Sequence, residues 1–361
     1  MSALIPTDSM NKAVRVLYMT HMAIGDFVYQ GPHLKALQQK FPNIQLDIWI
    51  DDLRDRSKSW HKRRNTTLCQ WLEDQSFIHS IYPIAESACE RQELIKQAQE
   101  RHYDVIFFIA TQRCDLYAKV ARAISSTANI VGTRSKALRN PIQLWWRFKR
   151  IDGYLREQSI PAEYQNHISD LYGFRFQTLV GAKSATATLQ ISPPDIWHQR
   201  ARDRLRNHAD ETVKRWLLIN PLSTSVKRDL SWAKTLRLII ALHQTHPSLG
   251  FVLNLPPDQL QTFQRKLAAE PAEPAIKIVP FTAKEHFYEL PAMLSCVDYV
   301  VTVETAIMHL AASVGTRQTA LVRDSAKHWR PMGDSQVVEC QGNVDSVDIT
   351  DLTKRITAHI G

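Results

Sequence analysis

Short apolar runs alternate with longer amphipathic segments along the chain. The apolar runs of the N-terminal half predict buried strands, and the segments between them carry apolar residues at helical spacing. This alternation is typical of a parallel sheet with helices on both faces, because such strands are buried on both sides. In this half, strands are predicted at residues 14–20, 44–50, 78–83, 105–110 and 129–132, and helices at 27–41, 86–101 and 116–124.

The same rhythm returns after about residue 185, beyond a stretch at 165–195 that interrupts it. A chain of 361 residues suits two domains with cores of their own. We therefore expect an α/β protein of two doubly wound domains, residues 1–180 and 181–361. In the second half, strands are predicted at 216–220, 251–255, 276–279, 299–303 and 319–322, and helices at 232–246, 258–269, 285–294, 305–314 and 349–360.

The composition excludes several protein classes. Hydrophobic residues make up 44% of the chain and charged residues 22%, a globular profile that excludes a largely disordered or fibrous protein. The five cysteines are odd in number and lack C-x-x-C spacing, so they predict scattered thiols rather than disulfides or a zinc site. Without a membrane-span pattern or a signal-peptide core, a cytoplasmic protein is expected.

The net charge of +9 favours an anionic partner. Residues 1–180 hold 24 Lys and Arg against 18 Asp and Glu, and residues 181–361 hold 21 against 18. Nucleic acid, a phosphorylated lipid surface and a nucleotide would each satisfy this balance, which does not choose among them. Cations gather with tryptophan in two stretches of the N-terminal half, 54–64 and 134–150.

Three strand ends carry candidate chemistry. After the first strand, the Asp26 carboxylate could take a proton from an attacking alcohol, or simply cap the next helix. After the strand at 216–220, Ser223, Thr224 and Lys227 suit a diphosphate, or form a solvated polar loop. After the strand at 299–303, a helix N-terminus could bind a diphosphate. Beside it, Glu304 could bind sugar hydroxyls or act as a cap, and His309 could be a core residue.

Several well-known motifs are absent from the sequence. It has no G-x-G-x-x-G after the first strand, no P-loop, no H-E-x-x-H and no G-x-S-x-G. Dinucleotide dehydrogenases, P-loop nucleotidases, zinc proteases of this type and α/β-hydrolases are therefore disfavoured.

Three segments together resemble glycosyltransferase family 9, the ADP-heptose:lipopolysaccharide heptosyltransferases. The resemblance runs from residue 14 to about residue 323. Its segments are Ile24-Gly25-Asp26 followed by Pro32, Leu34, Leu37 and Phe41-Pro42; Asn220-Pro221 through Lys227 and Trp232; and Glu304-Thr305-Ala306-Ile307-Met308-His309-Leu310-Ala311-Ala312. The chain departs from the family pattern at Glu304, which replaces Asp, and at Ala306, which replaces Gly.

The resemblance implies a GT-B fold, in which two Rossmann-like domains face a central cleft. It implies inverting transfer, without a metal ion or cofactor, of a heptose or related sugar from a nucleotide diphosphate sugar, expected to be ADP-heptose, to the lipopolysaccharide core. Asp26 matches the general base and Lys227 the lysine near the donor phosphates and sugar. The remaining donor-site matches are Ser223, Thr224, Thr305, Ala306 and Ile307 at the phosphates, His309 close by, Glu304 at the sugar, Asp258 at the ribose and Phe281 at the adenine.

The acceptor is expected to bind the N-terminal domain. The cationic residues proposed for its phosphates and carboxylates are Lys62, Arg63, Arg64, Arg134 and Arg139, and the nearby tryptophans would meet sugar faces or the inner membrane surface. We expect a monomer that contacts this membrane peripherally and binds no nucleic acid. Two alternatives stay open: a basic nucleic-acid-binding protein, and a non-catalytic sugar- or lipid-binding relative of the family.

Overall fold

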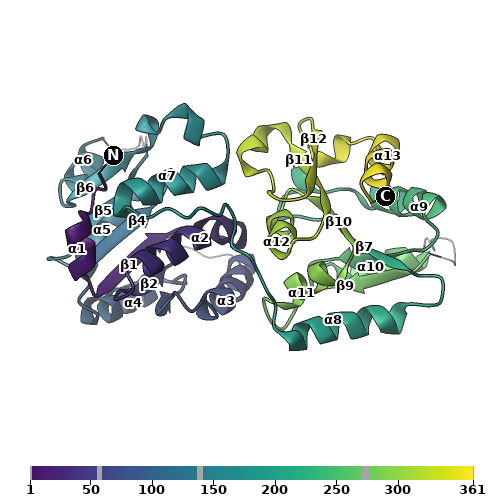
Figure 1. The fold of residues 1–361 in the computed structure, drawn as a ribbon, viewed down its shortest axis with the longest axis horizontal. Helices are drawn as coiled ribbons and strands as arrows, with labels where there is room; N and C mark the ends of the chain where they lie inside the picture. The colour runs from purple at the N-terminus through teal and green to yellow at the C-terminus, as the bar shows by residue number, and fades with distance from the viewer. Residues whose placement is uncertain (1, 55–58, 136–140, 270–275, 361) are drawn as a thin grey trace. The chain divides into compact units, whose positions relative to one another are not determined.

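The chain divides into two compact units, Met1–Leu189 (unit 1) and Gln190–Gly361 (unit 2). The computed structural model describes residues 2–54, 59–135, 141–269 and 276–360. Each unit contains one six-stranded sheet whose paired strands are parallel, with helices packed on it (Figure 1). Among the described residues, no helix has the length and apolar character needed to cross a bilayer.

Unit 1 has the strand order β3-β2-β1-β4-β5-β6. Helices α2 and α7 pack together, as do α4 with α5 and α5 with α6. The strands are β1 (Arg15–Thr20), β2 (Gln45–Trp49), β3 (Ser80–Tyr82), β4 (Val105–Ile109), β5 (Asn129–Arg134) and β6 (Gly153–Arg156). The helices are α1 (Thr7–Lys12), α2 (Ile24–Lys40), α3 (Ser59–Glu73), α4 (Ala88–Glu100), α5 (Cys114–Ile124), α6 (Pro141–Phe148) and α7 (Ile168–Val180).

Strand β1 shows why the central strands read as unbroken apolar runs. Successive side chains of a strand point to opposite faces of the sheet. Leu17 belongs to the core cluster shared with α4 and α5. The Tyr18 ring instead stacks on Phe107 with centroids 4.7 Å apart and lies 5.3 Å from Phe176 of α7. Both faces are therefore buried, and no polar position alternates with the apolar ones.

Unit 2 has the order β12-β11-β10-β7-β8-β9. When the strands of unit 2 are numbered from its own first strand, their order is the same as in unit 1. The strands are β7 (Arg215–Asn220), β8 (Leu249–Asn254), β9 (Ile278–Phe281), β10 (Tyr299–Val303), β11 (Gln318–Arg323) and β12 (Ser335–Cys340). The helices are α8 (Asp195–His208), α9 (Trp232–Thr245), α10 (Leu260–Ala269), α11 (Glu289–Cys296), α12 (Ala306–Val314) and α13 (Ile349–Ile360). The predicted α/β class with two doubly wound sheets is confirmed.

A proline inside α2 explains where unit 1 ends. Pro32 has no N–H and cannot bond the carbonyl of Val28 one turn earlier. The N–H of Leu189 donates to that carbonyl instead, at 2.8 Å. Gly31 allows this approach, because a Cβ there would lie 2.7 Å from Leu189 Cδ2. Residues 181–189 are thus attached to α2, and the observed division follows Leu189 rather than the predicted residue 180.

Candidate functional site

In each sheet, the strand order reverses between two central strands: β1 and β4 in unit 1, and β7 and β10 in unit 2. Ligands of doubly wound sheets bind beyond the carboxyl ends of the strands at such a reversal. The three motif segments follow β1, β7 and β10, so within each unit the fold brings them to this position.

Asp26 is the third residue of α2, not the residue that precedes the helix. Its Oδ2 accepts the backbone N–H of Ala23 at 2.8 Å, and its Oδ1 accepts the hydroxyl of Tyr172 at 2.8 Å. The carboxylate is half-buried. It therefore caps α2 from inside the helix, and α7 holds its second oxygen.

Tyr172 is a buried residue that the sequence did not single out. Burial raises the pKa of its phenol well above the ordinary value, and the negative charge of Asp26 adds to that effect. The phenol consequently keeps its proton and donates it in the bond to Asp26. One turn along α7, Arg175 forms a two-bond ion pair with Glu157, at 2.6 and 3.0 Å.

A cluster of charges lies at the carboxyl ends of β2 and β4. Asp52 is buried, and its carboxylate pairs with Arg54 at 2.9 Å and lies 3.8 Å from His21 Nδ1. Its carbonyl accepts Arg113 Nε at 2.8 Å. Leu53 and Arg113 have left-handed backbone angles (φ 56° and 52°), which cost energy for residues with side chains and are enriched at functional sites.

The neighbouring Asp51 is also buried and forms an ion pair with Arg91. Burial raises the pKa of the Asp51 carboxyl, which Arg91 opposes. Sequence reasoning assigned no role to either residue or to Arg113. The sequence signal that could have found Arg113 is its position, because Arg113 follows β4 much as Asp26 follows β1.

Asn220, the last residue of β7, connects the two motif segments of unit 2. Its buried amide Nδ2 lies 3.1 Å from Thr302 Oγ1 of β10 and 3.3 Å from Thr305 Oγ1. Its Oδ1 accepts Asn254 Nδ2, at the end of β8, at 2.9 Å. The loop after β7 and the start of α12 are therefore held together by one side chain.

The loop after β7 keeps one cation available. Ser223 turns its hydroxyl toward Asp229, at 2.8 Å, and Thr224 accepts Arg228 Nη2 at 2.8 Å. Lys227 is exposed in the short 3₁₀ turn Val226–Arg228, and no hydrogen bond or ion pair ties it to the described residues. Of the predicted phosphate-binding side chains, Lys227 is thus the one that is not already engaged in the loop.

Glu304 is buried and bound on both oxygens by the guanidinium of Arg323, each at 2.9 Å. Arg228 Nη1 lies 3.9 Å from the same carboxylate. The hydrogen bond and charge of Glu304 raise the pKa of Arg323. This carboxylate therefore joins β10 to the end of β11. The predicted contact with sugar hydroxyls would have to use its remaining lone pairs.

Thr305 is the N-cap of α12, and its hydroxyl accepts the N–H of Ile307 at 3.2 Å. Of the predicted backbone donors, Ile307 is thus already bonded, whereas Ala306 stands at the first helical position, where an N–H has no partner within its helix. His309 is buried, with its ring centroid 6.0 Å from that of Trp329.

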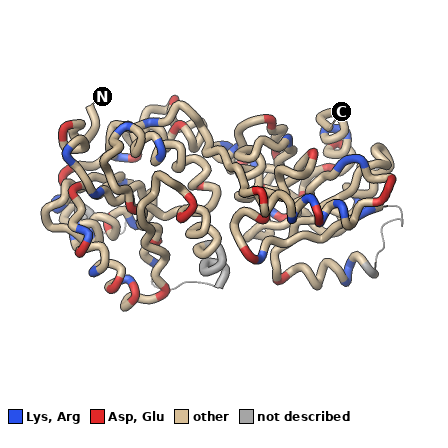
Figure 2. Tube along the Cα trace, turned by 60° about the horizontal axis from the view of Figure 1, so that its bottom comes forward, with Lys and Arg blue, Asp and Glu red and all other residues tan. Residues whose placement is uncertain are grey.

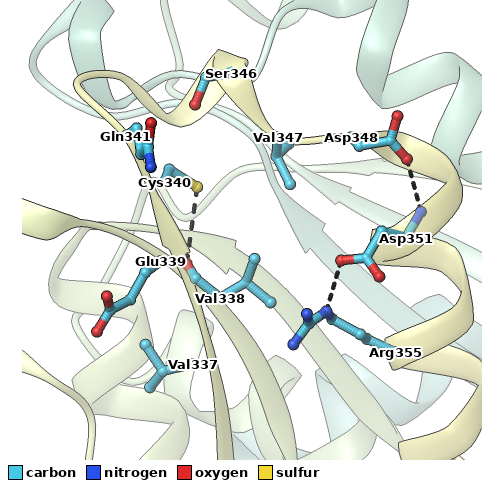
Figure 3. A pocket seen from close by; sticks show the side chains of 10 residues that line it. All are labelled: Val337, Val338, Glu339, Cys340, Gln341, Ser346, Val347, Asp348, Asp351 and Arg355. Atoms are coloured by element: carbon cyan, nitrogen blue, oxygen red, sulfur yellow. Dashed lines mark hydrogen bonds and ion pairs between the residues drawn. The ribbon is translucent and has the colours of Figure 1, made fainter.

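Two cavities bordered by described residues of unit 2 can be compared with the predicted donor site. One, of about 540 Å³, lies between β12 and α13 (Figure 3). Its walls include Cys340 and Arg355, and Arg355 Nε donates to Asp351 at 2.7 Å. No predicted donor-site residue is among its described lining residues. The other, of about 470 Å³, is bordered by Phe281, whose ring lies 5.3 Å from the Arg204 guanidinium.

Comparison with known proteins gives a family match for the C-terminal part of the chain. Residues 178–355 match the model of glycosyltransferase family 9 (heptosyltransferase). This match to glycosyltransferase family 9 covers just under half of the chain. The resemblance noted in the sequence is thereby confirmed, and with it the enzyme class, a glycosyltransferase. No curated protein sequence matches as a relative.

Three solved structures are similar in fold to this glycosyltransferase, and each alignment covers 96% of its chain. A family 9 glycosyl transferase from Veillonella parvula is 16% identical, with 97% of that chain covered and a TM-score of 0.75. The ADP-heptose lps heptosyltransferase II of E. coli is 13% identical, with 98% covered and a TM-score of 0.70. E. coli heptosyltransferase WaaC with ADP is 16% identical, with 100% covered and a TM-score of 0.65. The predicted GT-B fold class is confirmed.

The structure describes some of the predicted acceptor and remaining donor residues of this glycosyltransferase, but not all of them. Residues 62–64 fall in α3, but their side chains lie outside the described set, and Arg139 lies outside the described residues altogether. Arg134 donates to the Tyr154 hydroxyl at 2.9 Å and covers its ring. Asp258 is exposed in the turn before α10. Their roles in binding stay predictions.

Proposed function

We propose that this glycosyltransferase moves a heptose, or a closely related sugar, from ADP-heptose to the phosphorylated core of lipopolysaccharide. The transfer inverts the anomeric centre and uses neither a metal ion nor a cofactor. The enzyme works in the cytoplasm, in peripheral contact with the inner membrane surface. The observation that carries the proposal is the anchored Asp26 carboxylate at the strand-order reversal of unit 1.

Asp26 is the general base of the proposed reaction. Its hydrogen bonds to Ala23 and Tyr172 orient the carboxylate, which receives the proton of an acceptor hydroxyl. As that proton moves to Asp26, the acceptor oxygen forms its bond to the anomeric carbon, and the bond from that carbon to the nucleoside diphosphate breaks. Attack from the side opposite the leaving group inverts the centre.

Unit 2 stabilises the leaving diphosphate. Lys227 supplies a mobile cation, and the N-terminus of α12 supplies the N–H of Ala306 and the positive end of the helix dipole. The bonds of Asn220 keep both elements in one arrangement before the donor arrives. Charge that develops on the diphosphate then meets preorganised donors.

The choice of donor is supported by what similar structures bind. Heptosyltransferase WaaC of E. coli is described with ADP and with ADP-2-deoxy-2-fluoro heptose, and heptosyltransferase II is named for ADP-heptose and lps. A phosphorylated acceptor suits the cations of the N-terminal half, among which Arg54 and Arg113 stand beside the strand-order reversal.

The variant Asp26→Asn tests the base. We expect transfer from ADP-heptose to isolated lipopolysaccharide core to fall at least about 100-fold, because general base catalysis contributes about this much or more. Stabilisation by ADP in a thermal unfolding experiment should persist, since unit 2 is unchanged. Asp170→Asn is a matched control, because Asp170 occupies the same third position of α7 and is exposed. Near-normal turnover of Asp26→Asn would reduce Asp26 to a helix cap.

The variant Lys227→Ala tests the donor side. We expect ADP to bind roughly ten-fold more weakly, which is the loss of one charge-assisted phosphate contact. Lys214→Ala removes another exposed cation of unit 2 and should leave ADP affinity unchanged. Isothermal titration with ADP measures both. Equal affinities for the two variants would refute the role of Lys227.

A further inference from the structure

Helix α6 presents an apolar stripe to solvent. Ile142, Trp145 and Trp146 are 76%, 57% and 51% exposed, respectively. They stand at positions i, i+3 and i+4 and share one helical face. A surface helix of a globular protein normally turns its apolar side chains inward, so the exposure of these three is unusual.

The inward side of α6 is fixed independently of this stripe. Phe148 is buried in the core cluster of unit 1, with its ring centroid 6.3 Å from that of Phe108. Helix α6 packs on α5. Just beyond the helix, Arg122 Nε donates to the carbonyl of Arg150 at 2.7 Å. The exposed stripe is therefore held outward by a firmly packed element.

Cations accompany the exposed rings. The ammonium of Lys149, at position i+7 of the same face, lies 5.2 Å from the Trp145 ring centre. The guanidinium of Arg150 lies 3.5 Å from that of Trp146. Residues 134–151 contain six Lys and Arg and no Asp or Glu. Elsewhere on both units, basic and acidic residues are mixed along the trace (Figure 2). The chain segment that contains α6 thus carries only positively charged side chains.

We infer that α6 is the element by which unit 1 docks on an anionic lipid bilayer. Tryptophan rings favour the headgroup level of a membrane, where an apolar body and a polar N–H are both satisfied. Lys149 and Arg150 can keep their stems along the rings while their charges meet lipid phosphates. The inference deepens the proposed function and rests on it in one respect: the proposed acceptor is anchored in lipid, and docking would bring the enzyme to the same surface.

Vesicle cosedimentation of the full chain tests the docking. We expect binding to vesicles of equal parts phosphatidylglycerol and phosphatidylcholine, and much weaker binding to phosphatidylcholine alone. The double variant Trp145→Ala/Trp146→Ala should bind the anionic vesicles at least about ten-fold more weakly. Lys149→Glu/Arg150→Glu should lose at least about twenty-fold, since each cation near an anionic surface contributes about five-fold.

Controls separate docking from folding and from catalysis. Lys214→Glu/Lys354→Glu makes the same change of net charge on exposed residues of unit 2 and should bind vesicles almost as well as the parent. All variants should keep transfer to a core oligosaccharide freed of lipid. Failure of transfer by the parent chain would refute the proposed function without affecting the vesicle result. Unchanged vesicle binding by the tryptophan variant, or equal binding of the parent to both kinds of vesicle, would overturn the docking.

Discussion

At the scale of single residues, the bond between Tyr172 and Asp26 joins side chains 146 positions apart. A motif in the sequence is sufficient to select Asp26, because its neighbours Ile24 and Gly25 are contiguous with it. Nothing near Tyr172 marks it, since its role arises only when α7 packs on α2. Glu304 and Arg323 are a second example, because their pairing depends on the register of β10 and β11.

Tyr172→Phe should lower kcat by roughly ten-fold with little change in ADP affinity, because Asp26 loses a hydrogen bond of about 1.5 kcal/mol or more. In the parent, this hydrogen bond stabilises the ionised carboxylate. Without it, the acidic limb of the pH–kcat profile should move to higher pH. Tyr164→Phe is the matched control, since no hydrogen bond of its hydroxyl occurs within the described residues. A pH profile of Tyr172→Phe identical to that of the parent would contradict the positioning role.

His33 should make stability depend on pH. Burial, with a smaller contribution from Lys183, lowers the pKa of this imidazole to about 4, and its Nδ1 accepts the N–H of Ser184 at 3.0 Å. The unfolded chain binds this proton near pH 6.5, so the stabilisation is complete above that pH and is lost as the pH falls toward 4. The loss amounts to about 3 kcal/mol of unfolding free energy.

Denaturant unfolding at several pH values measures this effect of His33. The variant His33→Asn keeps an acceptor for the Ser184 N–H and cannot take up a proton. Its unfolding free energy should therefore change less than that of the parent between pH 7 and pH 4. Parallel curves for the two proteins would exclude His33 as the source.

At the scale of elements, the central strands could be predicted because both faces of each are buried. The edge strands β6 and β12 were missed for the opposite reason. Each pairs on one side only and fully buries few of its side chains, so polar residues such as Arg156 and Glu339 interrupt the apolar pattern. Helix α6 was missed as an element because its exposed tryptophans belong to no buried helical face.

In Gly31→Ala, a stabilising gain in helix propensity competes with a destabilising loss of packing. Alanine at a helix interior gains about 1 kcal/mol over glycine. The new Cβ, however, would lie within 3.4 Å of three Leu189 side-chain atoms, and the Leu189 backbone is tied to Val28. We expect a net loss of about 1–2 kcal/mol in unfolding free energy, because overpacking of this kind costs about 1–3 kcal/mol.

Urea unfolding of Gly31→Ala, Gly153→Ala, Leu189→Ala and the double variant Gly31→Ala/Leu189→Ala tests this packing argument. Gly153→Ala, where the nearest neighbour of the new Cβ is 3.6 Å away, should be nearly neutral. Leu189→Ala should reduce the cost of Gly31→Ala when the two are combined, because it removes the clashing atoms. Stabilisation by Gly31→Ala alone would mean that propensity outweighs packing there.

At the scale of the whole molecule, a ligand distinguishes the proposed enzyme from a nucleic-acid-binding protein. ADP at a hundred-fold excess over its Kd adds about 2.7 kcal/mol to stability, which should raise Tm by roughly 3–4 °C at any moderate salt concentration. An oligonucleotide held by the +9 net charge should do so only at low salt. Thermal scans at two salt concentrations measure both. Stabilisation by the oligonucleotide alone would favour the alternative.

The shared strand order has a consequence for how the chain is made. Strand β1 pairs with β4 from Val16–Val105 to Thr20–Ile109, and β7 pairs with β10 across a similar separation. As the ribosome releases the chain from its N-terminus, one edge of β1 stays unpaired until β4 emerges. One edge of β7 later stays unpaired until β10 emerges. The pairing beside the reactive loop of each unit therefore joins the two neighbouring strands that are released furthest apart in time. A nascent chain interrupted before residue 105 carries Asp26 without β4, and one interrupted before residue 299 carries Lys227 without β10 and α12.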